Sequence, residues 1–137
     1  FAAYTASKYG VVGFQKAIAM EYRRENINFN MILPTMVDTQ LLRGEKAGKG
    51  ETPPGVMEPE ELNLYYLFLL SDNANRVNDE LIFVNQFEQL KSVIKETPKE
   101  KKESWDIFSN YLENNEPNLY EEVKKNRRLV SFLLENL

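Results

Sequence analysis

The stretch Ile27–Pro34 (INFNMILP) decides the fold class of this chain. Apolar side chains stand at every second position of residues 27–33, which is the pattern of a β-strand, and a proline ends the run. A helical segment that opens with a proline follows at 59–70, and then comes the short apolar run Leu81–Val84. A strand, a helix and a second strand in this order form a parallel crossover unit. The sequence therefore predicts an α/β fold with a parallel sheet.

Residues 2–25, before this strand, contain no proline and are apolar at a helical period, so we predict one long helix. A helix that is apolar around most of its circumference is expected to pack on more than one side. Two stripes run along this helix. One holds Val11, Phe14, Ile18 and Tyr22, and the other holds the small residues Ala6, Gly10, Gly13 and Ala17, which would let another helix come close.

All six glycines lie between Gly10 and Gly55, so tight turns are expected in the first part of the chain. Residues 35–57 combine glycines, prolines and charges, which predicts a long loop. A loop of this length inside a compact domain is usually functional. The next helix is expected to place its aromatic residues in the core, namely Tyr65, Tyr66 and Phe68.

The tail of the chain predicts two antiparallel helices, 98–114 and 117–136, joined by a short loop. A capping box at Thr97–Glu100 is expected to start the first of them. The basic cluster Lys124, Lys125, Arg127 and Arg128 is expected to be a solvated face. The apolar stripe of this hairpin should be buried, and it consists of Trp105, Phe108, Tyr111, Val123, Val130 and Leu133.

The composition excludes several kinds of chemistry. The 137 residues include no Cys and no His, so disulfides, thiolate nucleophiles, the usual zinc sites and a Ser-His-Asp triad are ruled out, and we assign no metal ligands. A net charge of −4 argues against a nucleic-acid partner. No apolar run reaches the roughly 18 residues of a membrane span, and no leader pattern opens the chain. We therefore expect a cytoplasmic protein whose acid–base chemistry comes from Tyr, Lys, Asp or Glu.

Tyr4 and Lys8 are the residues best suited to such chemistry. Their spacing puts them on one side of the predicted helix, one turn apart. An ammonium group beside a phenol favours the phenolate, and the phenol can then pass a proton to or from a substrate oxygen. The spacing alone is common, because a surface tyrosine beside a solvated lysine shows it too.

Five segments in order resemble the short-chain dehydrogenase/reductase family, whose active-site helix reads Tyr-x-Ala-Ser-Lys. The resemblance covers about residues 1–86. The segments are Tyr4–Lys8 (YTASK), Ala17–Glu21 (AIAME), Ile27–Thr39 (INFNMILPTMVDT), Glu58–Asp72 and Leu81–Val84 (LIFV).

The resemblance implies the C-terminal half of a Rossmann-like parallel-sheet domain over residues 1–87, followed by a two-helix α extension over 88–137. It implies an NAD(P)-dependent oxidoreductase that transfers a hydride to or from a small-molecule carbonyl or alcohol, with the choice between NAD and NADP left open. Helix 2–25 would form a homo-oligomer interface, and residues 40–57 would cover the substrate.

The resemblance also assigns roles to single residues. Tyr4 would be the catalytic acid/base, and Lys8 would bind the nicotinamide ribose and favour the phenolate. Pro34, Val37 and Thr39 would line the nicotinamide, with Thr39 near its carboxamide.

The sequence departs from the family pattern in several places. Thr35 replaces the glycine of a Pro-Gly pair, Asp79 replaces a glycine before the last strand, and Gln86 and Phe87 replace a glycine pair after it. The glycine-rich cofactor loop and the catalytic serine of the family have no match, and the sequence opens at Phe1 within a helical pattern. We therefore expect part of a longer protein, inactive as an isolated chain.

Two alternatives stay open. The first is a non-catalytic dehydrogenase-like scaffold that uses its helical tail for partner contacts. The second is an interaction module centred on the tail alone.

Overall fold

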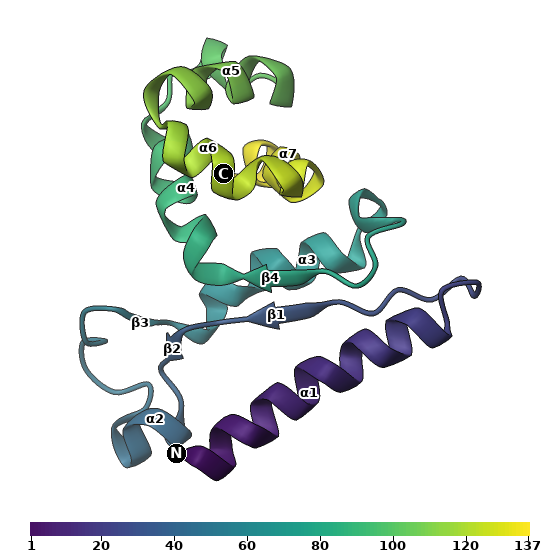
Figure 1. Ribbon diagram of the computed structural model, residues 1–137. Coiled ribbons are helices and arrows are strands. Elements are labelled where there is room, and N and C mark those ends of the chain that lie inside the picture. Colours follow the sequence, from purple (N-terminus) through teal and green to yellow (C-terminus); the bar gives the residue numbers. More distant parts are fainter.

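The computed structural model describes residues 1–137 as a mixed α/β chain, and its helical tail follows the last strand (Figure 1). Two strands form the centre, and helices lie on both sides of them. The helices are α1 (Ala2–Glu21), α2 (Gln40–Arg43), α3 (Asn63–Leu70), α4 (Val84–Glu96), α5 (Trp105–Asn115), α6 (Pro117–Val123) and α7 (Arg127–Asn136). The strands are β1 (Met31–Leu33), β2 (Met36–Val37), β3 (Val56–Met57) and β4 (Leu81–Phe83).

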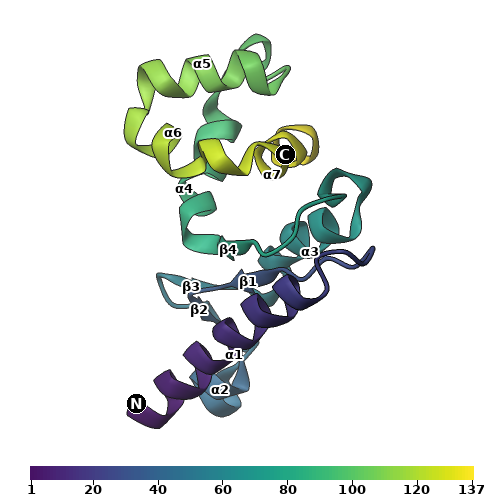
Figure 2. The same ribbon diagram turned by 45° about the vertical axis from the view of Figure 1, so that its right-hand side comes forward.

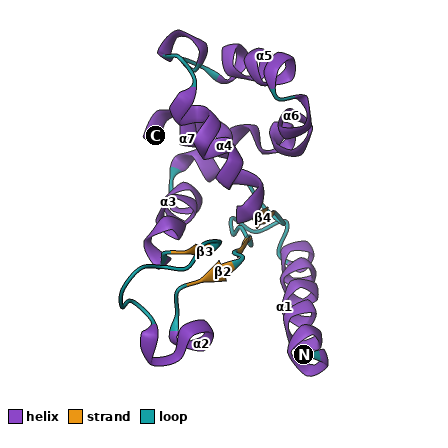
Figure 3. Ribbon diagram, turned by 90° about the vertical axis from the view of Figure 1, so that its left-hand side faces the viewer, coloured by secondary structure: helices purple, strands orange, loops and turns teal.

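The predicted parallel crossover is confirmed. β1 pairs with β4 in parallel, with Met31 opposite Leu81 and Leu33 opposite Phe83. The crossover runs through α3, and Figure 3 shows α1 and α3 on opposite sides of the strands. Helices on both faces are what a parallel pair needs, because its strands are apolar on both sides.

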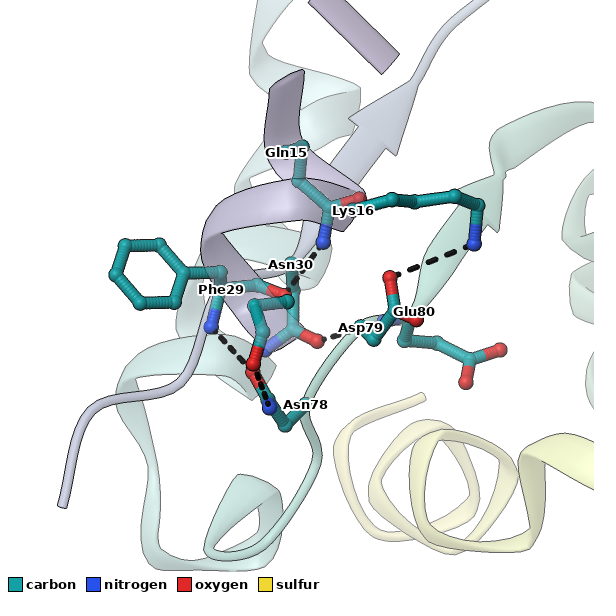
Figure 4. A network of polar contacts seen from close by, with 8 residues as sticks. Gln15, Lys16, Phe29, Asn30, Asn78, Asp79 and Glu80 are labelled. Carbon is teal, nitrogen blue, oxygen red and sulfur yellow. Dashed lines mark hydrogen bonds and ion pairs between the residues drawn. The ribbon is translucent and has the colours of Figure 1, made fainter. Parts of the chain in front are cut away.

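Side-chain amides fix the two strands at their amino ends (Figure 4). Asn30 donates to the Val77 carbonyl at 2.8 Å and accepts from the Glu80 amide at 3.1 Å. Asn78 accepts from the Phe29 amide at 2.7 Å. The strand predicted over 27–33 is therefore shorter than expected, because the residues before Met31 bond to side chains and a turn instead of a neighbouring strand.

The same region holds α1. The Gln15 side chain donates to the Phe29 carbonyl at 2.7 Å, and the Asn78 amide reaches the Ala19 carbonyl at 3.5 Å. Lys16 adds an exposed ion pair with Asp79 at 3.4 Å. We call Gln15, Asn30 and Asn78 the amide clasp, since their side chains join α1, β1 and the turn before β4.

The burial predicted for α1 is wrong within this chain. Gln15 and Ala19 are its only buried residues, whereas Val11, Phe14 and Tyr22 of the predicted apolar face are exposed. The helix ends at Glu21 rather than near residue 25. The reason is that α1 contacts the rest of the chain through one narrow face around Gln15 and Ala19, and no other element covers most of the two predicted stripes.

The segment 35–57 is more ordered than a loop prediction implied. β2 and β3 form a short parallel pair, with Val37 opposite Met57, and α2 lies between them. Beyond it, Glu58 and Glu61 form a capping box ahead of α3, with the Glu58 amide donating to Glu61 at 2.9 Å. On α3 itself, Tyr65 and Phe68 are buried as predicted. Tyr66 was expected in the core but is exposed, because it lies about 100° around the helix from the buried Tyr65.

The tail contains four helices rather than the two predicted. α4 was missed, and it buries Val84, Phe87, Leu90 and Ile94 at helical spacing. The predicted capping box at Thr97 is wrong, since the Thr97 hydroxyl donates back to the Val93 carbonyl at 2.7 Å and closes α4 instead.

The two predicted tail helices are also shorter or interrupted. The first begins at Ser104, whose hydroxyl accepts from the Ile107 amide at 3.4 Å. The second is interrupted by a 3-10 turn at Lys124–Asn126, which separates α6 from α7. No helix in the structure is both long and apolar enough to cross a bilayer.

One continuous hydrophobic core includes residues of the tail, α3 and β4. Figure 2 shows α3 and β4 side by side, with the tail helices next to them. Phe108, Val123, Val130 and Leu133 of the predicted stripe are fully buried, and Trp105 and Tyr111 pack on the core while half-buried. Thus the tail packs on its own helices and on α3.

A polar group lies beside this core. The Tyr65 hydroxyl donates to Glu88 at 3.3 Å, and Lys91 pairs with the same carboxylate at 2.7 Å. Burial, together with the charge of Glu88, raises the pKa of the Tyr65 phenol well above its ordinary value. This phenol is therefore a neutral donor that ties α3 to α4.

We predict that Phe108→Ala lowers the free energy of unfolding by about 3–5 kcal/mol, because it empties a fully buried site. The neighbouring Ile107, which is 41% exposed, provides the control, and Ile107→Ala should cost about 1 kcal/mol or less. Trp105→Ala should fall between the two, since this ring is half-buried. Urea unfolding followed by circular dichroism measures all three, and equal losses for Phe108→Ala and Ile107→Ala would contradict the packing described.

Candidate active site

The carboxyl ends of β1 and β4 lie at one edge of the parallel pair (Figure 1). The segment 34–39 leaves the sheet at this edge. α1 runs opposite to β1, so its first turns lie toward the same edge (Figure 1). Ligands of open α/β sheets bind in the crevice outside the carboxyl ends of the strands. The sequence-predicted residues therefore gather where such a fold binds its ligands.

The structure brings Tyr4 and Lys8 together. The Lys8 ammonium lies over the Tyr4 ring, 5.4 Å from its centroid, which is within cation–π range. Tyr4 is 53% exposed, and its hydroxyl makes no hydrogen bond within the chain. The Ser7 hydroxyl donates to the Tyr4 carbonyl at 2.7 Å and braces this first turn. The phenol is thus adjacent to a cation and open to a second molecule.

Pro34, Val37 and Thr39 follow β1 along one short stretch of chain. Pro34 is exposed, and Val37 is half-buried in β2. Thr39 is exposed and precedes α2 with an extended backbone, and its hydroxyl makes no capping bond. No hydrogen bond joins any of the three to Tyr4 or Lys8, so the structure puts them at the same edge without direct polar contact.

Sequence reasoning missed a buried ion pair beside Thr39. The Asp38 side chain is 1% exposed, and its Oδ2 lies 2.5 Å from Arg43 Nη1. The Gly48 amide donates to the same oxygen at 3.2 Å, and Arg43 donates to the Lys49 carbonyl at 3.2 Å. These bonds tie both ends of residues 38–49 together. The available signal was an aspartate directly before Thr39 with an arginine about one helical turn later.

Asp38 is also incompletely satisfied. Its second oxygen, Oδ1, is buried and has no hydrogen-bond partner. Buried carboxylate oxygens are rarely left unpaired. Asp38 therefore holds the loop through one oxygen, while its other oxygen is buried without a partner.

The backbone explains two departures from the family pattern. Thr35 has no positive φ, so this position does not require a glycine in this chain. Asp79, which stands where a glycine is usual, keeps a glycine-like φ of 60°. Aspartate tolerates the left-handed region better than most residues. Gly44, Gly48, Gly50 and Gly55 all have positive φ and form the turns expected of the loop.

Comparisons with known proteins identify the family of this chain. A family model described as enoyl-(acyl carrier protein) reductase matches residues 1–86, which is more than half of the chain. The match ends within α4, so the tail lies beyond it. No solved structure gives a significant match to the chain.

Several curated relatives are dehydrogenases or reductases. A 3-oxoacyl-[acyl-carrier-protein] reductase from Chlamydia muridarum is 32% identical over 88 residues, covering 60% of this chain and 36% of that protein. An NAD-dependent glycerol dehydrogenase from Listeria innocua is 35% identical over 92 residues, covering 61% and 35%. A trans-4-hydroxycyclohexanecarboxylate dehydrogenase from Sinomonas cyclohexanicum is 40% identical over 75 residues, covering 54% and 29%.

The match spans about a third of the length of these curated relatives. Nevertheless, the family model covers the stretch that holds the Tyr4–Lys8 pair and the parallel crossover. The chain belongs to the short-chain dehydrogenase/reductase family.

Proposed function

We propose that this chain carries the acid–base part of an NAD(P)-dependent oxidoreductase acting on a small-molecule carbonyl or alcohol. The observation that carries the proposal is the Lys8 ammonium over the Tyr4 ring, 5.4 Å from its centroid, on a helix end at the carboxyl edge of the parallel strands. Membership of a family of oxidoreductases supports the reaction type.

In this proposal Tyr4 gives its phenolic proton to the carbonyl oxygen during reduction, or takes the alcohol proton during oxidation. The positive charge of Lys8 stabilises the phenolate that remains. NAD or NADP, when bound, supplies or accepts the hydride. Lys8, Pro34, Val37 and Thr39 would hold it. The donor set fits, because the Lys8 ammonium makes no ion pair and the Thr39 hydroxyl has no partner.

Two further roles belong to the same proposal. Residues 40–57 would cover the substrate, and the Asp38–Arg43 pair would set the shape of that loop. α1 would form a homo-oligomer interface, because a Cβ added at Gly10 or Gly13 would meet nothing within 4 Å. A second helix could therefore approach this stripe closely.

A scaffold protein without chemistry is the second candidate. Tyr4 is half-exposed, and α4 starts directly after β4, with Phe87 in the core where the family usually has glycine. The two candidates differ in one respect, which is whether the Tyr4 hydroxyl is needed for turnover.

We predict that Tyr4→Phe lowers cofactor-dependent turnover by about 10²-fold or more, the contribution of a positioned acid. Cofactor affinity should change little, since the ring and the helix remain. Tyr9→Phe is the matched control, because Tyr9 lies on the same helix, is more exposed and should be dispensable. The assay needs the glycine-rich cofactor loop as well, and residues 1–137 alone should show no turnover. Unchanged turnover in Tyr4→Phe would favour the scaffold.

We predict that Asp38→Asn loosens residues 38–49. The change removes the negative charge that holds Arg43. A charged hydrogen bond of this kind stabilises the closed loop, so its loss should raise the population of the open loop, and with it cleavage after Lys46 and Lys49, about tenfold. Limited trypsin digestion measures this, and Asp72→Asn, an exposed aspartate of another turn, is the control. Equal digestion of Asp38→Asn and the parent chain would mean that the ion pair does not hold the loop.

A further inference from the structure

A hollow of about 340 Å³ lies between the turn before β4 and the start of α7. Residues 76–78 and Glu80 line one side, and residues 125–129 line the other. Residues 76–80 lead into β4, so the hollow lies at the amino ends of the strands, whereas Tyr4 and Lys8 lie toward the carboxyl ends. In Figure 4 the Glu80 side chain points from this turn toward the neighbouring helix.

Positive charge converges on this hollow. Arg76, Lys125, Arg127 and Arg128 line it, with Glu80 as the one carboxylate. Glu80 is occupied, since its Oε1 accepts from the Asn126 side chain at 2.9 Å. The chain as a whole carries a net charge of −4, so this excess of cations is local.

The basic cluster predicted as a solvated face divides into two. Lys124 does not line the hollow and pairs with Glu121 at 2.6 Å. The other three cations of the cluster line the hollow, where they meet Arg76 from a turn about fifty residues earlier. Sequence reasoning could not join them, because the turn and the cluster come together only through packing of α7 on the α3 side.

Most of the charge is available to a ligand. Arg76 and Lys125 make no ion pair and no side-chain hydrogen bond. Arg127 has only a long, exposed contact with Asp106 at 3.5 Å. Arg128 is held by the carbonyls of Asn73 and Asn75, which fixes its guanidinium beside the hollow. Arg76 also has a φ of 71°, which is uncommon for a residue other than glycine.

We propose that this hollow binds a small anion that carries phosphate groups, such as a pyrophosphate or a phosphate ester. Arginine and lysine bind phosphate oxygens through strong, charge-assisted hydrogen bonds. The volume lies near the lower end of small-molecule sites, which run from about 300 to 1,000 Å³. Four cations suit a ligand with several negative charges better than a single carboxylate. The ligand would link the turn before β4 to α7.

The test is isothermal titration calorimetry of the 137-residue chain with inorganic pyrophosphate at constant ionic strength. A single saturable site is expected. Arg76→Gln combined with Lys125→Gln should weaken binding by about tenfold or more, since each removes a charged partner. The matched control is Arg24→Gln with Lys95→Gln, which makes the same change in net charge at exposed positions outside the hollow. The control pair should leave the affinity unchanged.

Glu80→Gln should have the opposite effect on affinity, because it removes the only negative charge that lines the hollow and keeps a side-chain oxygen to accept from Asn126. It should tighten pyrophosphate binding several-fold. A parallel titration with glycerol phosphate separates a preference for esters from one for pyrophosphate. Tyr4→Phe should bind pyrophosphate like the parent, so this site and the proposed reaction fail independently.

Two results would overturn the proposal. One is the absence of saturable binding. The other is an equal loss of affinity in the Arg76/Lys125 variant and in the control variant, which would mean that pyrophosphate binding depends on the net charge of the chain and not on this hollow. Circular dichroism of each variant checks the fold, and Glu80→Gln remains decisive if the double variant does not fold.

Discussion

The amide clasp of Gln15, Asn30 and Asn78 determines how α1, the central strands and the turn before β4 fit together. The central β1–β4 pair is only three residues long on each side, too short to fix its own register firmly. The clasp adds side-chain bonds from Asn30 and Asn78 to backbone groups at the amino end of the pair. A partly buried amide left without its partner costs about 1–3 kcal/mol. Side-chain hydrogen bonds therefore fix the register of β1 and β4, and the points where they begin, as much as the backbone hydrogen bonds between the two strands do.

The same clasp orients α1 and therefore the candidate active site. Gln15 and Ala19 are the only residues of α1 that the chain buries, and Tyr4 lies eleven residues before Gln15. At 1.5 Å per residue, this separation along the helix is about 17 Å. A small rotation at the clasp would move the Tyr4–Lys8 pair by a much larger distance. The polar anchor at one end of α1 thus controls the chemistry expected at the other.

Sequence patterns predicted the local features well. The alternation in Ile27–Leu33, the Pro59 helix start and the run at Leu81 led to the parallel crossover. Helical spacing paired Tyr4 with Lys8 and identified Phe108 and Leu133 as core.

Features that depend on distant segments escaped the sequence. The family pattern has glycines where Gln86 and Phe87 stand, and this obscured the start of α4. The prediction that α1 packs on more than one side is wrong within this chain, because hydrophobic periodicity indicates which helix face is apolar but not which element covers that face. The basic hollow arises from the docking of α7 near the turn before β4, for which a linear pattern carries little signal.

We predict that the amide clasp holds α1, and with it Tyr4 and Lys8, in one orientation on the strands. The chain has no cysteine, so Ala3→Cys on α1 and Asn85→Cys after β4, both exposed positions, can be spin-labelled uniquely. Double electron–electron resonance between the labels should give one narrow distance distribution. The distribution should broaden in Asn78→Ala and stay narrow in Asn75→Ala, whose exposed side chain makes no hydrogen bond. A distribution that is broad with the clasp intact, or that stays narrow in Asn78→Ala, would mean that the clasp does not orient α1.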